Sequence, residues 1–156
     1  MEFFYPRGLR FAQQMLGNPQ DAEEALQDTF VRVHDNIAKF REDARFEPWL
    51  FRILANRCRT LGAKQQRHHA IIDYGDLPID AAAEAETRDE WTAQVYGALD
   101  RLPAEQREAF LLRHVEGMEY DDMATVTGAG LSTLRMRVKR ASDALRARLR
   151  EVELYG

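Results

Sequence analysis

Apolar side chains recur at intervals of three and four along most of the chain, which is the period of a helix with one buried face. This pattern predicts a helix over residues 9–16, ended by Gly17, and a second helix over residues 19–40. Asn18 suits the N-cap of the second helix, and Pro19 suits its first position. The predicted buried stripe of that helix consists of Ala22, Leu26, Phe30, Val33, Ile37 and Phe40.

A third helix is predicted to begin at Pro48 and to weaken near Gly62. The periodicity is lost over residues 71–88, which contain one glycine, one proline and five acids and therefore indicate a linker. The sequence thus predicts an all-α protein with two small helical domains, residues 1–70 and 89–156, joined by a flexible acidic linker. Helical patterns fill the second domain over residues 91–102, 103–117, 120–128 and 131–150.

The last two helical patterns form a recognisable pair. A short helix "YDDMATV", a glycine-bearing turn "TGAG" and a longer helix are typical of a helix-turn-helix, whose second helix enters the DNA major groove. On the longer helix the predicted buried face consists of Leu131, Leu134, Val138, Ala141 and Leu145. The opposite face and its flanks carry Ser132, Thr133, Arg135, Met136, Arg137, Lys139 and Arg140.

The distribution of charge supports a nucleic-acid partner. The chain has a net charge of −4, yet residues 131–150 hold seven bases and one acid, and residues 49–69 hold five bases and no acid. Residues 70–100 hold one base and eight acids. Bases clustered in this way favour DNA binding even in an acidic chain.

The remaining composition narrows the function class. Apolar residues make up 45% and charged residues 31%, which is a globular balance. The chain has no apolar run of about 18 residues for a membrane span and no secretory leader pattern, so a cytoplasmic protein without membrane insertion is expected. We find no catalytic pair, no cofactor motif and no ordinary zinc spacing around Cys58, His68 and His69.

Three stretches together resemble the extracytoplasmic-function (ECF) sigma factors of the sigma-70 family. "NPQDAEEALQDTFVRV" resembles the region 2 helix that docks on the clamp of RNA polymerase. "FEPWLFRILANRCRT" resembles the following segment, which engages and opens the −10 promoter element. "LDRLPAEQREAFLLRHVEGMEYDDMATVTGAGLSTLRMRVKRASDALRARL" resembles the region 4 domain, which reads the −35 element.

The resemblance implies a site for each function, and core RNA polymerase, promoter DNA and an anti-sigma factor as partners. The residues expected to contact polymerase are Glu24, Gln27 and Asp28. The residues expected to contact the −10 element are Arg52, Asn56, Arg57, Arg59, Lys64 and Arg67. The residues expected to contact the −35 element are Ser132, Thr133, Arg135, Met136, Arg137, Lys139 and Arg140. Lys139 and Arg146 are expected to bind phosphates of the DNA backbone.

Departures from the family pattern refine this expectation. The dense arginine run usual after Asn56 is diluted here, which predicts weak and salt-sensitive promoter opening. Ser132 stands where glycine is usual and Met136 where a small polar residue is usual, which suggests an altered −35 preference. Two other readings stay open: a stand-alone helix-turn-helix regulator that binds an operator as a dimer, and an inert interaction module sequestered by a partner.

Overall fold

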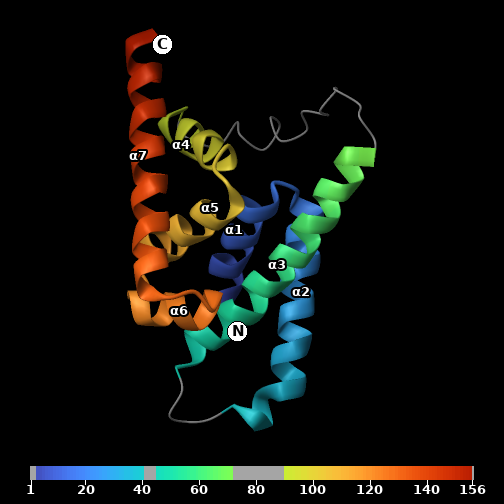
Figure 1. The fold of residues 1–156 in the computed structure, drawn as a ribbon. Coiled ribbons are helices and arrows are strands. Elements are labelled where there is room, and N and C mark those ends of the chain that lie inside the picture. The colour runs from blue at the N-terminus through green and yellow to red at the C-terminus, as the bar shows by residue number, and fades with distance from the viewer. Residues whose placement is uncertain (1–2, 41–44, 72–89, 156) are drawn as a thin grey trace.

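The computed structural model describes residues 3–40, 45–71 and 90–155, and every regular element within those ranges is a helix, so the all-α prediction is confirmed. The elements run in the following order (Figure 1): α1 (Phe4–Leu16), α2 (Pro19–Asn36), the 3-10 turn η1 (Ile37–Lys39), α3 (Phe46–Ile71), α4 (Glu90–Asp100), α5 (Ala104–Phe110), the π-helical turn η4 (Leu111–Val115), α6 (Tyr120–Thr127) and α7 (Leu131–Tyr155).

Helices α1, α2 and α3 pack on one another to form the first half of the molecule. The Asn18 side chain caps α2 by accepting hydrogen bonds from the backbone N–H groups of Gln20 and Asp21, at 2.8 and 3.3 Å. A Cβ added at Gly8 would lie 2.7 Å from Cδ1 of Leu26, so the glycine allows α1 and α2 to approach closely. Helix α1 begins five residues earlier than predicted and ends, as predicted, at Gly17 with φ of 69°.

Two predictions about the first half are wrong in detail. The predicted buried residue Ile37 is 49% exposed, because α2 ends at Asn36 and the chain turns into η1, which rotates the next side chains away from the stripe. Helix α3 begins at Phe46 rather than Pro48. It then continues through Gly62 to Ile71, since the helix packs against α1, α2 and α6 and the cost of one glycine is small.

Helices α4 to α7 form the second half, with α7 as its longest element. Of the predicted buried face of α7, Leu134, Val138, Ala141 and Leu145 are at most 6% exposed and pack toward α4, α5 and α6. Leu131 is 37% exposed, which corrects the prediction that it is buried. It is the first residue of α7 and lies about one turn before Leu134, the first buried residue of the stripe.

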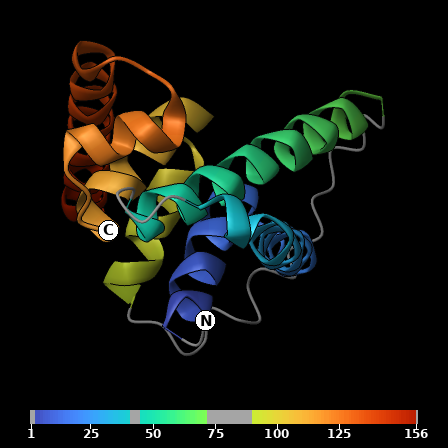
Figure 2. The same ribbon diagram turned by 90° about the horizontal axis from the view of Figure 1, so that it is seen from below.

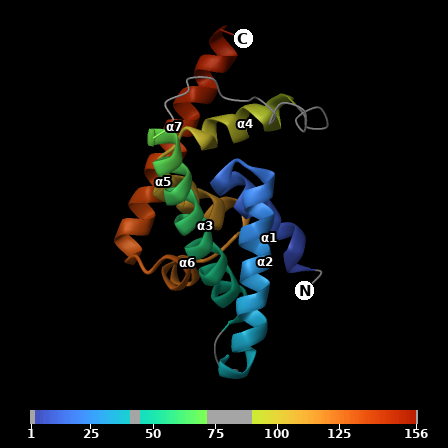
Figure 3. The same ribbon diagram turned by 90° about the vertical axis from the view of Figure 1, so that its right-hand side faces the viewer.

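The two halves lie against each other. Helix α3 packs against α6, and α1 contacts α4 and α5. Helices α2 and α7 lie on opposite sides of the molecule (Figures 1 and 3). The view from below shows α3 crossing beside α6 (Figure 2). The predicted linker, residues 71–88, falls almost wholly outside the described residues, so the linker and the domain bounds stay predictions. Within the described part, no helix is both long and apolar enough to cross a membrane.

Candidate nucleic-acid interface

The first turns of α7 present a polar, basic face to solvent. Ser132, Thr133, Arg135, Met136, Lys139 and Arg140 are all exposed, and Arg137 is partly exposed. Met136 is 48% exposed, so this thioether is not part of the core. Because the buried stripe lies on the other side of the helix, docking of α7 leaves this face free to contact a groove.

An aromatic side chain fixes one of the arginines on this face. The Arg135 guanidinium lies over the Tyr120 ring at 5.4 Å from its centroid, and Arg113 lies over the same ring at 4.8 Å. Nη1 of Arg113 also donates a hydrogen bond of 2.8 Å to the carbonyl of Met118, ahead of α6. The sequence did not single out Tyr120, although its place at the start of the first helix of the pair was visible. Tyr120 thus restricts where Arg135 can point.

A shallow hollow of about 450 Å³ lies beside the exposed face of α7. It is lined by Ser132, Thr133, Met136, Arg137 and Arg140 of α7 and by Glu105 of α5, among others. Glu105 approaches Arg137 at 3.5 Å, and its side chain is 75% exposed. An exposed ion pair at this distance contributes little, so Arg137 can exchange it for a phosphate or a base edge.

The predicted −10 residues lie on α3, but they do not all point the same way. Arg52, Asn56, Arg59 and Lys64 are exposed, and Nη1 of Arg59 donates a hydrogen bond to Oδ1 of Asn56. The backbone of Arg67 continues the helix, but its side chain lies outside the described residues. The structure therefore brings Asn56 and Arg59 together on one exposed side of α3.

Arg57 points instead toward α2. Its Nε donates a 2.7 Å hydrogen bond to Oδ2 of Asp28, and its Nη2 lies 3.5 Å from Oε1 of Glu24. The ion pair joins a predicted −10 residue to two of the predicted polymerase residues, a link between α2 and α3 that the sequence did not predict. Gln27 is exposed on the same side of α2, and Val31, one turn further on, is 59% exposed.

Arg59 has its principal partner in the other half of the chain. Its Nε and Nη2 donate hydrogen bonds of 3.0 and 2.7 Å to the two carboxylate oxygens of Glu108 on α5. The Glu108 side chain is only 5% exposed. Sequence reasoning missed this residue, although a signal was present: Glu108 lies four positions before buried Leu112, so an acid occupies the core-facing side of a helix.

A second buried carboxylate, Glu116, lies at the end of the π-helical turn. The Glu116 N–H donates to the carbonyl of Leu111 at 2.9 Å, and Gly117, with φ of 69°, turns the chain away immediately afterwards. The Glu116 side chain is 1% exposed and accepts hydrogen bonds from Arg7 Nε at 2.9 Å and Arg10 Nη2 at 3.0 Å. This contact again joins α1 of the first half to the second half.

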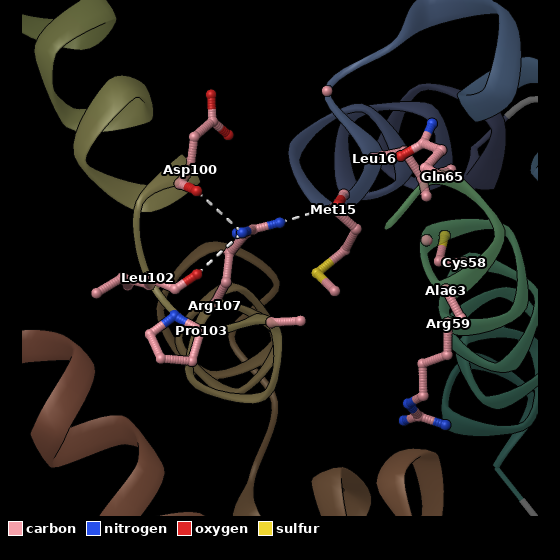
Figure 4. Close-up of a pocket in the computed structure, with 13 residues that line it drawn as sticks. Met15, Leu16, Cys58, Arg59, Ala63, Gln65, Asp100, Leu102, Pro103 and Arg107 are labelled. Carbon is pink, nitrogen blue, oxygen red and sulfur yellow. Dashed lines mark hydrogen bonds between the residues drawn. The ribbon is translucent and has the colours of Figure 1, made fainter. Parts of the chain in front are cut away.

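Between the two halves lies a hollow of about 600 Å³ (Figure 4). Arg107 reaches into it and donates to the carbonyls of Met15, Asp100 and Leu102 (Figure 4). Cys58 lines the hollow from α3, and burial raises the pKa of its thiol to about 12, so it is protonated and unreactive at neutral pH. Within the described residues, no cluster of His, Cys, Asp or Glu could hold a metal ion.

Comparison with known proteins identifies both halves. Residues 2–68 match the family described as Sigma-70 region 2, and residues 92–145 match Sigma-70 region 4. The chain is 32% identical over 139 residues to the ECF RNA polymerase sigma factor EcfG of Rhodopseudomonas palustris. This alignment covers 89% of this chain and 77% of the relative. It is 30% identical over 161 residues to the RNA polymerase sigma-H factor of Pseudomonas aeruginosa, covering 88% of this chain and 81% of that protein.

Solved structures agree with this assignment. The sigma factor RpoE of Bartonella quintana, determined in complex with the anti-sigma factor NepR, superimposes with a TM-score of 0.77 at 27% identity, covering 93% of this chain and 91% of that one. CnrH, determined in complex with the cytosolic domain of CnrY, gives a TM-score of 0.69 at 27% identity, covering 96% and 86% of the two chains. The helices, the two matched regions and these relatives show that the chain belongs to the ECF RNA polymerase sigma factors of the sigma-70 family, which are transcription initiation factors and not enzymes.

Proposed function

We propose that this sigma factor reads the −35 element with the exposed face of α7. The observation that carries the proposal is the division of α7 into a buried apolar stripe and an exposed face of four bases, two hydroxyls and Met136. Arginine and lysine side chains on such a face can bind guanine edges or phosphates in the major groove. Arg135, Arg137 and Arg140 are the candidates for base contact, and Lys139 and Arg146 for phosphate contact.

Within this face, Ser132, Thr133 and Met136 contribute shape and hydrogen bonding rather than charge. The exposed thioether of Met136 suits apolar contact with a thymine methyl group, which serine at this position would not provide. Selection of bound −35 duplexes from a random pool, by the parent and by Met136→Ser, tests this assignment. A shift of preference at one position, with the rest of the motif unchanged, is expected for Met136→Ser. Identical motifs would remove Met136 from the specificity set.

We further propose that the exposed side of α3 contacts the opened −10 element. Asn56 offers both a donor and an acceptor to an unstacked base, while Arg52, Arg59, Lys64 and Arg67 attract the phosphates of the single strand. The pairing of Arg57 with Asp28 supports a different first role for Arg57, which is to hold α3 against α2. Reactivity of −10 thymines toward permanganate in reconstituted holoenzyme tests the assignment, with Asn56→Ala expected to reduce it.

The outer face of α2 is the proposed contact with core RNA polymerase. Glu24 and Gln27 are exposed there, and Val31 adds an exposed apolar side chain to the same face. Asp28 and Glu24 are poorer probes, because both pair with Arg57 and reversing either charge would also repel that arginine. We therefore expect Gln27→Arg combined with Val31→Arg to reduce assembly with core enzyme in a pull-down, while Glu90→Lys on α4, which changes the net charge equally, leaves assembly unchanged. Equal assembly of both variants would mean that α2 docks through another face.

An anti-sigma factor is the remaining proposed partner. Two structurally similar sigma factors, RpoE of Bartonella quintana and CnrH, were solved bound to NepR and to the cytosolic domain of CnrY. Since this chain shares their fold at 27% identity, a partner of the same class is expected here. Promoter DNA and polymerase also imply a cytoplasmic location. Affinity purification of the tagged chain from its own cells tests the polymerase and the anti-sigma partner together. Core polymerase subunits and a small anti-sigma protein should copurify, whereas a stand-alone regulator would not require polymerase.

A further inference from the structure

An acid of α5 lies beside the −35 face of α7. Glu105 is the second residue of α5, and its Oε2 lies 3.5 Å from Nη2 of Arg137. The Glu105 side chain is 75% exposed, whereas that of Arg137 is 25% exposed. An exposed pair at this separation adds little to stability, so the fold does not depend on this carboxylate.

The same carboxylate borders the hollow of about 450 Å³ that lies against the −35 face. Most of the residues that we assign to the −35 element line this hollow, namely Ser132, Thr133, Met136, Arg137 and Arg140. Its other lining residues are Pro103, Glu105 and Gln106, at the start of α5. A base edge or a phosphate that contacts these side chains of α7 therefore also meets the first turn of α5.

That first turn is held in a fixed position. The backbone N–H groups of Gln106 and Arg107 both donate to the carbonyl of Pro103 at 3.0 Å. The Arg107 guanidinium donates to the carbonyl of Leu102 at 2.9 Å, just ahead of the turn. Helix α5 also packs against α7 (Figure 1). Glu105 is thus carried by a rigid element, which suits a side chain that selects a base.

A carboxylate at a DNA interface is selective in a way that an arginine is not. It repels phosphates, so it adds nothing to the affinity that is independent of sequence. In the major groove it can only accept a hydrogen bond, and the donors there are the exocyclic amines of cytosine and adenine. The amine of cytosine is the usual partner of glutamate, while O6 and N7 of guanine are the usual partners of arginine. A G·C pair offers both kinds of group on its major-groove edge.

We propose that Glu105 is a specificity-determining residue for the −35 element. Its carboxylate accepts a hydrogen bond from the amine of a cytosine, next to a guanine that Arg137 binds. The proposal rests on the proposed reading of the −35 element by α7. A phosphate on Arg137 would leave the adjoining Glu105 facing a negative charge, whereas the edge of a G·C pair satisfies both side chains. The acid therefore favours a base contact over a phosphate contact for Arg137.

Selection of promoter fragments that are randomised over the −35 element gives the first test, with holoenzyme reconstituted from core polymerase and the full chain. The parent should favour one G·C pair, and Glu105→Ala should reduce that preference about tenfold while the other positions keep theirs. Glu105→Gln should move the preference at this pair toward A·T, because an amide suits adenine. The matched control is Glu90→Ala, which changes the net charge equally at an exposed position of α4 and should leave the motif unchanged.

A cytosine analogue shows whether the carboxylate itself makes the contact. In 2-pyrimidinone a hydrogen replaces the exocyclic amine of cytosine, so the ring is kept and the proposed donor is lost. One such base at the selected pair should weaken binding by the parent holoenzyme about tenfold more than binding by Glu105→Ala. The variant corrects for the weaker pairing of the analogue with guanine, which affects both proteins alike.

The proposal would be overturned by a motif that Glu105→Ala leaves unchanged, or changes only where the parent selects an A·T pair. Equal losses for the parent and Glu105→Ala on the analogue would also overturn it, because Glu105 would then act only by orienting Arg137. Failure of the −35 assignment itself looks different, since Arg137→Ala and Arg140→Ala would then leave the motif unchanged as well. If those two variants alter the motif and Glu105→Ala does not, α7 reads the −35 element without Glu105.

Discussion

Loss of the Arg107 side chain should destabilise the fold, because its guanidinium joins the second half to α1 and holds the chain together between α4 and α5. Its guanidinium donates to the carbonyls of Leu99, Asp100 and Leu102 at 3.0, 3.0 and 2.9 Å, and to that of Met15 at 2.9 Å. These carbonyls lie at or just beyond the ends of α4 and α1, where the helices offer no further N–H donors. A cation at two helix ends is also favoured by both helix dipoles.

The magnitude follows from these contacts. A hydrogen bond from a charged donor contributes about 1.5–3 kcal/mol, but the contributions of four do not add in full. Burial lowers the pKa of Arg107, which shows that desolvation of the guanidinium offsets part of the gain. The adjoining hollow also admits water, which can satisfy the carbonyls in a variant. We therefore expect Arg107→Ala to lower the free energy of unfolding by about 2–4 kcal/mol.

Urea unfolding followed by circular dichroism measures this loss. The matched control is Arg101→Ala, an exposed arginine six residues away, for which about 0.5 kcal/mol or less is expected. Arg107→Lys keeps the charge but cannot reach four carbonyls from one ammonium, so it should recover less than half of the loss. A loss below about 1 kcal/mol for Arg107→Ala, or one equal to that of the control, would refute the argument that these four contacts stabilise the fold.

The remaining predictions concern the two DNA faces and the buried thiol. Arg140→Ala should weaken binding to the cognate −35 duplex by about 1–3 kcal/mol in a gel-shift assay if the arginine binds a base, whereas a uniform loss on cognate and scrambled duplexes would indicate a phosphate contact. Tyr120→Leu removes the ring under Arg135 and should relax selection at one base pair of the −35 motif with little loss of helix content; an unchanged motif would show that Arg135 needs no support. Cys58, with its pKa raised to about 12, should react with a disulfide reagent at neutral pH only in urea, and rapid reaction of the native protein would contradict its burial.

The sequence alone determined the local elements, because each is encoded by residues close together in the chain. The N-cap Asn18 and the end of α1 at Gly17 were readable, as was the apolar period that buries Leu134 and Val138 on α7. The same period implied the exposed basic face of that helix. Helix ends were less certain, and Ile37 was predicted to be buried because periodicity does not show where a helix stops.

Only the tertiary structure decided which charged groups meet. Arg57 pairs with Asp28 at a separation of 29 residues and Arg59 pairs with Glu108 at 49, while Arg107 reaches the carbonyl of Met15 across 92. No local period encodes such pairs, since an arginine on a helix surface looks the same whether it faces water, DNA or a carboxylate. The choice is made when apolar stripes on separate helices are buried together, which fixes the helix positions and brings these side chains within hydrogen-bonding distance.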